Sequence, residues 1–222
     1  MDYVFDPNLV LYLPFYKLDG ASFMSGDAYG HLATVTGALW TPVGHLFDGI
    51  DDKITVPHHA SFNPSTSGLS VLAWAKCTDV ALSDRRLVTK QKVSASFDGF
   101  VLNVTQTNGY ANLYVRDDLT NTLDTVYNGA SYADSSFHLF AGTILLGSAT
   151  GAKVYVDGNL KKTGDLSSLT GSITTTADLF IGKFRDASGY FAGTIGEVWL
   201  YSRVLSAVEI QDIYLATKGR YQ

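Results

Sequence analysis

Short runs of apolar residues, or of alternating apolar and polar residues, recur along the chain. Each run is bounded by Gly, Asp, Asn or Ser. Runs of this length and spacing are typical of antiparallel strands in a sandwich or jelly roll. The predicted strands are 9–16, 45–56, 69–77, 86–90, 97–105, 110–116, 122–127, 137–145, 152–157, 178–183 and 190–201. The pattern therefore predicts an all-β protein.

Two pairs of these runs are joined by residues that favour tight turns. Asp157-Gly158 separates residues 154–156 from 159–161, and Asn108-Gly109 lies between 102–104 and 113–115. Asp-Gly and Asn-Gly accept the positive φ that a two-residue hairpin turn requires. Both pairs are predicted to be β-hairpins.

One helix is predicted near the C-terminus. Ser206 and Glu209 form the sequence Ser-x-x-Glu of a capping box, in which each side chain accepts a hydrogen bond from the other residue's backbone N–H. Gly219 offers a stop. Apolar residues follow the capping box at partly helical spacing: Val208, Ile210, Ile213 and Tyr214.

The composition supports strands and limits the chemistry. Of the 21 acidic residues among 222, 19 are Asp and only Glu197 and Glu209 are Glu. Strong helix formers are scarce, whereas Tyr, Phe, Val and Thr, which suit a pleated and half-buried surface, are plentiful. This composition argues against an α-rich or doubly wound α/β fold. The two glutamates exclude any mechanism that needs more than one Glu from the body of the chain.

The charge balance narrows the partners. Sixteen Lys and Arg against 21 Asp and Glu give a net charge of −5, spread without blocks. Because no basic patch is available to neutralise phosphates, no nucleic acid partner is expected. No apolar stretch approaches the roughly 20 residues of a membrane helix, so no membrane insertion is expected. No basic residue precedes Lys17, and the sequence shows no signal peptide.

Cys77 is the single cysteine of the chain, so no internal disulfide can form. It falls within a predicted strand, and this context favours a buried, unreactive thiol over a nucleophile.

Several short motifs follow one another in a fixed order. They are 9–15, DAYG at 27–30, FDGIDDKITVP at 47–57, SVLAWAK at 70–76, VYVDG at 154–158, LFIG at 179–182, YFAGTIGEVWLY at 190–201 and RVLSAVEI at 203–210. In this order they resemble the laminin-G-like, concanavalin A-like lectin/glucanase family of jelly rolls. The resemblance spans about residues 9–217.

This resemblance implies a two-sheet antiparallel β-sandwich, a concanavalin A-like jelly roll, with one short C-terminal helix. We expect a single laminin-G-like domain over residues 1–222. Trp74 and Trp199 are expected to bury large apolar area within the sandwich, together with the alternating Val154 and Val156.

The resemblance also raises a structural calcium ion as a possible cofactor. Ca²⁺ takes about 6–8 oxygen ligands. Asp48 and Asp51 lie with Asp52 in a tight glycine-containing turn, Asp27 lies in another turn, and Glu197 lies on the closing strand. Where the family often has Asp before this Glu, the chain has Gly196, which removes one hard ligand. The alternative is that these Asp residues form turns by holding backbone amides.

No catalytic residues are predicted. Glucanases of this fold carry Glu-x-Asp-x-x-Glu on one strand, and a retaining pair of carboxyl groups lies about 5–5.5 Å apart. Glu197 is followed by Val198-Trp199-Leu200-Tyr201, and Glu209 belongs to the capping box. We therefore expect no enzyme, with glycan cleavage the weaker alternative.

Exposed aromatic faces and polar loop side chains commonly hold sugar rings. Candidates of this kind lie in three polar loops. The expected ligand-binding residues are Tyr110, Tyr132, Arg185, Asp186 and Tyr190. The alternative for each Tyr is packing at the edge of the core.

The resemblance favours a non-catalytic carbohydrate-binding or adhesion module that acts through rim loops on a glycan or a protein surface. The alternative is a structural surface or decoration protein of a virus particle or cell envelope, forming a homo-oligomer or a capsid lattice. Either role predicts an extracellular or virion-surface location. A fold alone does not decide between these roles.

Overall fold

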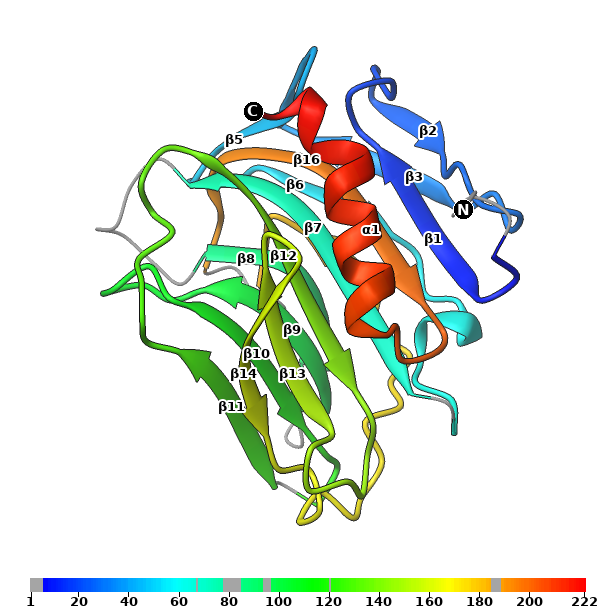
Figure 1. The fold of residues 1–222 in the computed structure, drawn as a ribbon. Helices are drawn as coiled ribbons and strands as arrows, with labels where there is room; N and C mark the ends of the chain where they lie inside the picture. Colours follow the sequence, from blue (N-terminus) through cyan, green and yellow to red (C-terminus); the bar gives the residue numbers. More distant parts are fainter. Residues whose placement is uncertain (1–5, 67, 78–84, 94–96, 120, 185–188) are drawn as a thin grey trace.

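The computed structural model describes residues 6–66, 68–77, 85–93, 97–119, 121–184 and 189–222. These residues form two eight-stranded sheets packed face to face, with one α-helix near the C-terminus (Figure 1). Every strand pair is antiparallel. The predicted all-β sandwich with a short C-terminal helix is confirmed.

Sheet A contains the two longest strands, β7 and β16. Its order is β14 (Asn159–Gly164), β13 (Ala152–Val156), β12 (Phe137–Ile144), β7 (Leu69–Cys77), β16 (Ala192–Tyr201), β5 (Gly44–Asp48) and β4 (Leu39–Thr41). The N-terminal strand β1 (Leu9–Pro14) pairs with the C-terminal half of β16, whose N-terminal half pairs with β5. Segments from both ends of the chain therefore lie side by side.

Sheet B is the second layer. Its order is β11 (Thr122–Tyr127), β10 (Ala111–Arg116), β9 (Gly99–Val104), β8 (Arg85–Gln91), β15 (Leu179–Ile181), β6 (Lys53–Val56), β3 (Leu32–Thr36) and β2 (Ser22–Met24). The strands β2, β3 and β4 were not predicted. They are short and bury few side chains, so they carry little alternating pattern.

The predicted strand 45–56 was wrong as a single element, because it is two strands in different sheets. Between β5 and β6, Oδ1 of Asp48 accepts the backbone N–H of Ile50 at 2.8 Å and of Asp51 at 3.4 Å. Gly49 takes a φ of 80°. This turn carries the chain from sheet A to sheet B, which a continuous strand cannot do.

Both predicted hairpins are present, with different turns. Asp157 and Gly158 take φ values of 53° and 74°, as a tight two-residue turn requires. Between β9 and β10 the chain instead makes a longer loop, residues 105–110, in which Gly109 has a φ of 67°. The backbone N–H of Tyr110 donates to Oγ1 of Thr105 at 3.0 Å within this loop.

The larger apolar cluster fills the space between the sheets. Alternate residues of most strands point into it, including the predicted Val154 and Val156 of β13. Cys77 also lies there, fully buried, and burial raises the pKa of its thiol to about 12. The predicted burial of the cysteine is confirmed, and a thiol with this pKa stays protonated at neutral pH and is a poor nucleophile.

A second apolar cluster covers the outer face of sheet A. Trp74 and Trp199 lie in this cluster and not between the sheets, so their predicted position was wrong although both are buried. Ala73 and Ala75 of β7 face the interior between the sheets. Side chains alternate along a strand, so Trp74 between them points to the outer face of sheet A. The α-helix and the chain end pack over it (Figure 1).

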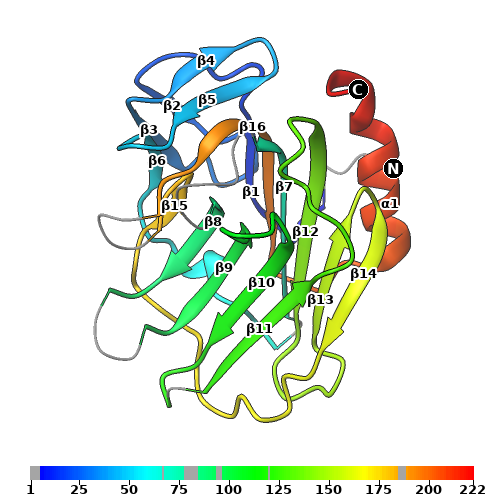
Figure 2. The same cartoon turned by 90° about the vertical axis from the view of Figure 1, so that its left-hand side faces the viewer.

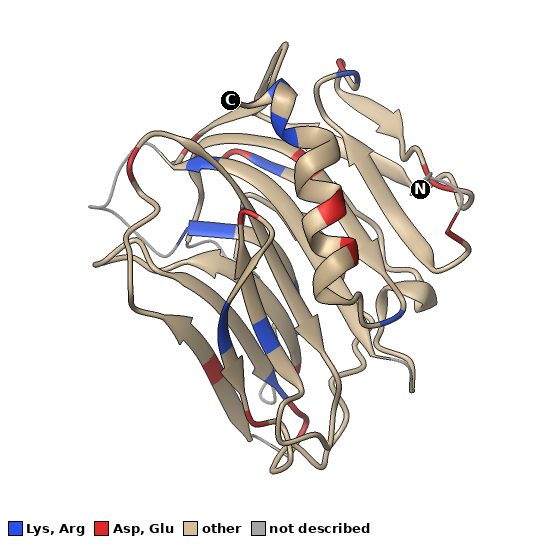
Figure 3. Cartoon of the chain, viewed as in Figure 1, with Lys and Arg blue, Asp and Glu red and all other residues tan. Residues whose placement is uncertain are grey.

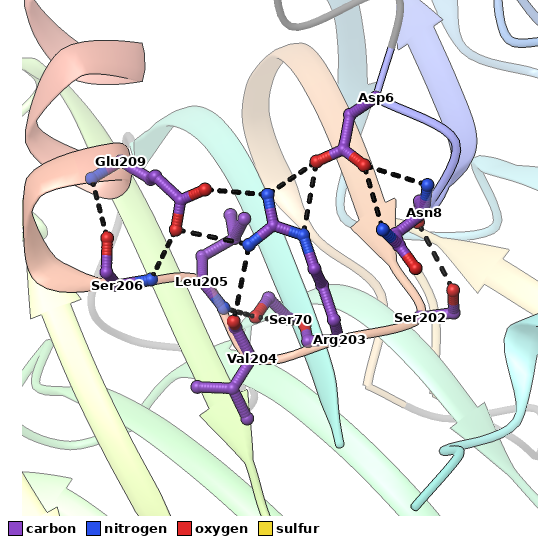
Figure 4. A network of polar contacts seen from close by, with 9 residues as sticks. All are labelled: Asp6, Asn8, Ser70, Ser202, Arg203, Val204, Leu205, Ser206 and Glu209. Atoms are coloured by element: carbon purple, nitrogen blue, oxygen red, sulfur yellow. Dashed lines mark hydrogen bonds and ion pairs between the residues drawn. The ribbon is translucent and has the colours of Figure 1, made fainter. Parts of the chain in front are cut away.

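The helix α1 (Ala207–Thr217) begins with the predicted capping box. The backbone N–H of Glu209 donates to Oγ of Ser206 at 3.2 Å, and the N–H of Ser206 donates to Oε2 of Glu209 at 2.8 Å. Arg203 then bridges Glu209 to Asp6 (Figure 4). This network joins the start of the helix to the N-terminal segment. A short 3₁₀ turn, η3 (Lys218–Arg220), follows the helix.

Candidate functional site

The outer face of sheet B lies on the opposite side of the molecule from α1 (Figure 2). Leu113 of β10 faces sheet A, because its side chain lies against Gly142 of β12. The neighbours of Leu113 in β10 therefore point outward, together with their cross-strand partners. We call these outward residues the polar face: Arg86, Thr89, Asn103, Asn112, Tyr114, Arg116, Asp124 and, on β15, Phe180.

A ladder of side-chain amides crosses the polar face. Nδ2 of Asn112 donates to Oδ1 of Asn103 at 3.3 Å and to Oδ1 of Asp124 at 2.9 Å. Both donors of this amide are thus used, and the orientation of Asn112 is fixed. Three adjacent strands, β9, β10 and β11, are linked through side chains as well as backbone.

Cationic side chains stack on aromatic rings around this ladder. The guanidinium carbon of Arg86 lies 4.2 Å from the ring centre of Phe184, and that of Arg116 lies 5.3 Å from Phe97. Nζ of Lys183 lies 5.0 Å from the ring centre of Phe180. Such stacking holds the charged groups in place and leaves hydrogen-bond donors at their edges.

Some polar atoms of this face are buried without a hydrogen-bond partner among the described residues. They are Oδ1 of Asn112, Oγ1 of Thr89 and Nε of Arg116. An unsatisfied buried polar atom costs about 1–3 kcal/mol. A ligand rich in hydroxyl groups supplies both donors and acceptors to such atoms.

Two of the predicted ligand residues lie beside the polar face. The ring of Tyr190 is 5.9 Å from Nζ of Lys183, the same ammonium group that contacts Phe180. Tyr110 lies in the loop immediately before β10, two residues from Asn112. Both are half-buried. Their predicted role in ligand binding stays a prediction.

Tyr132 was expected to expose its ring in a polar loop, but the structure buries it. It is only 7% exposed and belongs to the interior cluster. Its ring packs edge-on against Phe140 at 5.7 Å and against His138 at 5.0 Å. Burial raises the pKa of its hydroxyl to about 12. A ring packed in this way has no free face for a sugar. Arg185 and Asp186 lie outside the described residues.

The structure brings together only part of the predicted calcium set. Carboxylate oxygens of Asp48, Asp51 and Asp52 lie within 4.8 Å of one another, the one such acidic or metal-ligating group of three found in the described ranges. Asp52, which was not among the selected ligands, is 5% exposed and accepts the backbone N–H of Asp48 at 2.8 Å. Burial raises the pKa of its carboxyl. Calcium at this turn stays a prediction.

Asp27 and Glu197 have other roles. Asp27 accepts the backbone N–H of Tyr12 at 2.9 Å and of Tyr29 at 2.8 Å, so it fastens its turn to β1. This is the turn-forming alternative predicted for the Asp residues. Neither Asp27 nor Glu197 belongs to the carboxylate group found in the described ranges.

Glu197 is fully buried on β16 and has three partners. It accepts the guanidinium of Arg220 at 2.6 Å, the hydroxyl of Tyr12 at 2.7 Å and that of Tyr221 at 3.2 Å. Burial and the Glu197 charge raise the pKa of both tyrosines far above the usual range. The carboxylate ties β1, β16 and the chain end together under α1.

The polar face was missed from the sequence, although a signal was present. Asn103 and Asn112 interrupt otherwise apolar strands, FVLNV and ANLYV, at outward positions. Once the register is known, polar residues at alternate positions of neighbouring strands mark one face. The sequence does not give this register.

Charged side chains are dispersed over the strands, loops and helix, with both signs interspersed (Figure 3). This agrees with the absence of charge blocks in the sequence. The helices in the described residues are all too short and too polar to cross a bilayer.

Comparison with known proteins places the chain in a family. A family model described as the concanavalin A-like lectin/glucanases superfamily matches residues 48–211, and the chain belongs to this superfamily. The predicted resemblance is confirmed. No curated protein sequence matches the chain.

Solved structures with the same fold include clostridial toxin domains. A botulinum neurotoxin serotype D ligand binding domain in complex with N-acetylneuraminic acid superposes with a TM-score of 0.74 at 14% identity, over 95% of this chain and 51% of that one. The serotype G binding domain gives 0.74 at 14% identity, over 95% and 51%. The binding domain of Paraclostridial Mosquitocidal Protein 1 gives 0.72 at 11% identity, over 94% and 52%. The chain thus spans about half the length of these neighbours, and such low identities show a shared fold alone.

Proposed function

We propose that this protein is a non-catalytic carbohydrate-binding module and that the polar face of sheet B is its binding surface. The observation that carries the proposal is the set of buried, unpartnered polar atoms at Thr89, Asn112 and Arg116 among the described residues. These atoms lie beside aromatic rings and fixed cations on a sheet face away from the helix. The hydroxyl groups of a sugar can pair with the unpartnered polar atoms, and the apolar face of its ring can pack on the aromatic rings.

The charge of the face favours a glycan with acidic groups. Arg86, Arg116 and Lys183 contribute three cations, against the carboxylate of Asp124. Arginine held by stacking donates two parallel hydrogen bonds to a carboxylate or sulfate. The neurotoxin neighbour that binds N-acetylneuraminic acid, a carboxylated sugar, supports this class of ligand by its fold alone. A module of this kind acts where glycans are displayed, outside the cell or at a particle surface.

Catalysis is not part of the proposal, because both glutamates have structural partners. Glu197 is enclosed by Arg220, Tyr12 and Tyr221. Glu209 is held by Arg203 and by the capping box. Neither is free to act as the acid or nucleophile of a glycosidase.

A glycan array with and without EDTA tests the proposal. We expect binding to acidic glycans, and about tenfold weaker binding by Arg116→Gln, because a hydrogen bond from a charged group contributes about 1.5–3 kcal/mol. Lys162→Gln on β14 of sheet A removes the same charge from an exposed site and should bind as the wild type does. If the wild type binds no glycan in either condition, the proposal fails and the structural role remains. Loss of binding or of thermal stability in EDTA would support calcium at Asp48, Asp51 and Asp52.

A further inference from the structure

A hollow lies away from the polar face, at the edge of sheet A formed by β4. The strands β4 and β5 form a hairpin there, and β4 is the last strand of its sheet (Figure 2). A hollow of about 270 Å³ opens beside the hairpin, and we call it the hairpin hollow. Its lining includes Asp19, Val35, Gly37, Leu39, Trp40 and His45.

Trp40 gives the hollow an aromatic wall. It is the one tryptophan that is not in either apolar cluster of the described residues, and 38% of it is exposed. Leu39, next to it, is 65% exposed. An edge strand that exposes two large apolar side chains in succession offers an apolar surface to a ligand.

His45 lies directly opposite Trp40 across the hairpin and lines the same hollow. It is 1% exposed, and its Nδ1 has no hydrogen-bond partner in the part of the chain that the structure describes. Phe15 packs edge-on against its ring at 5.0 Å. Burial lowers the pKa of the imidazole to about 4, against the opposing effect of Asp19. At neutral pH the ring is uncharged and offers one donor and one acceptor.

The charges around the hollow exclude one class of ligand. Asp19 is an exposed carboxylate in its wall. A second hollow of about 390 Å³ shares Gly37 and Leu39 with it and is lined by Asp48 and Asp52. No Lys or Arg of the described residues lines either hollow. An acidic sugar would meet carboxylates here, whereas the hydroxyl groups of a neutral sugar donate to them.

We propose that the hairpin hollow binds one ring of a neutral sugar, stacked on Trp40, with hydroxyl groups bonded to Asp19 and His45. The volume lies just below the roughly 300–1,000 Å³ of pockets for drug-sized ligands, which suits a single ring at the end of a glycan. This site goes beyond the polar face, which favours acidic glycans and uses other strands. The protein then carries two sites of opposite charge preference.

Titration of the whole chain by tryptophan fluorescence and calorimetry tests this site. The probes are methyl glucoside, methyl galactoside and N-acetylglucosamine as neutral sugars, N-acetylneuraminic acid as an acidic sugar and glucosamine as a cation. We expect one or more neutral sugars to bind and to change the emission of the exposed Trp40. Trp40→Ala should weaken that binding about tenfold, because an aromatic stacking contact is lost.

Further variants separate the site from general effects. His45→Phe keeps an aromatic ring at this buried position and removes the nitrogens, so it should weaken neutral sugar binding while the protein stays folded. Leu160→Ala on β14 removes another exposed apolar side chain from an edge strand and should have no effect on binding. A shift of the His45 ring nitrogens in NMR spectra on adding the sugar would support direct contact even if a variant unfolds.

Three results would overturn the inference. One is that no neutral sugar binds. Another is that binding is unchanged by Trp40→Ala. The third is that glucosamine binds at Trp40 more tightly than N-acetylglucosamine, which would make this a cation site. The proposed function is tested separately. If acidic glycan binding is lost in Arg116→Gln and kept in Trp40→Ala, binding at the polar face is supported even when the hairpin hollow binds no sugar.

Discussion

The two sheets treat their outer faces differently. The outer face of sheet A carries large apolar side chains, including Leu72, Trp74 and Trp199, and α1 packs over it. The outer face of sheet B carries amides, arginines and a carboxylate, and α1 lies on the opposite side of the molecule. Sheet A thus packs against sheet B on one face and under α1 on the other. The outer face of sheet B has no helix of the described residues over it, although Thr89, Asn103 and Asn112 are buried there among their neighbours.

The polar groups of the two faces differ in the same way. Under α1, Nε1 of Trp74 donates to Oγ1 of Thr217 at 2.8 Å, and Glu197 has three partners. On sheet B, Thr89 and Asn112 keep polar atoms without partners among the described residues. Groups already satisfied within the protein stabilise it, whereas a buried group without a partner costs free energy until a partner reaches it. The first face is stabilised by its own contacts, and the second carries the atoms on which the proposed binding depends.

The largest effect is expected from Trp74→Ala. Trp74 is fully buried and stacks on Tyr221 at 4.6 Å between ring centres. Truncation should lower the free energy of unfolding by about 3–5 kcal/mol, as for other buried aromatic residues. Urea denaturation measures this loss, and the exposed Trp40→Ala should cost far less. Equal losses at the two positions would show that the face under α1 is not a core.

The next effect is expected from Arg220→Gln, which should lower the free energy of unfolding by about 3–5 kcal/mol. It leaves the fully buried carboxylate of Glu197 with two tyrosine hydroxyls and no cation. Lys218→Gln, in the same 3₁₀ turn, removes the same charge from a side chain that packs on Tyr214. Denaturant midpoints of the two variants provide the comparison. If they coincide, the Glu197 pair does not stabilise the chain end.

Acid should lower the free energy of unfolding by protonating Glu209, which pairs with Arg203 at the start of α1. Hydrogen bonds from Arg203 hold the pKa of Glu209 down at about 2, against about 4.5 for a free side chain. Because the folded pKa is the lower one, this stabilisation is present above pH 4.5 and is lost as the pH falls towards 2. With partial solvent screening we expect about 1–2 kcal/mol.

Unfolding experiments on the wild type and Glu209→Gln from pH 6 to pH 2 check this effect. The difference between the two proteins should be largest near neutral pH and should vanish near pH 2. A difference that does not depend on pH would show that the ionised carboxylate is not what stabilises this corner.

The smallest effect on stability is expected on sheet B. Arg116→Gln removes one cation–π contact with Phe97 from a half-buried side chain, and should cost no more than about 1 kcal/mol. A stability loss as large as that of Arg220→Gln would mean that the polar face is structural. Thermal melting of the two variants side by side decides between these outcomes.

Much of the fold could be predicted, because its signals are local. Alternation marked most of the longer strands, Asp157-Gly158 marked a turn, and Ser206 with Glu209 marked the helix start. Strands β2, β3 and β4 were missed because they are short and mostly exposed, at or next to the edge of a sheet, and such strands need no apolar alternation. The site residues were harder to predict. Tyr110 and Tyr132 each lie in a polar loop, and the sequence around them does not show which ring is exposed. Only packing shows that the ring of Tyr132 is enclosed by Phe140 and His138.

The sequence by itself determined the class of fold, the family and the scarcity of Glu that argues against glycan cleavage. These properties depend on residue type and on spacing over a few positions. The tertiary structure decided which face each strand presents, and therefore that Trp74 lies under the helix while Asn103, Asn112 and Asp124 meet on the opposite sheet. The order and register of the strands decide which residues become neighbours. These neighbours are distant along the chain, so the local pattern of the sequence does not encode their contacts.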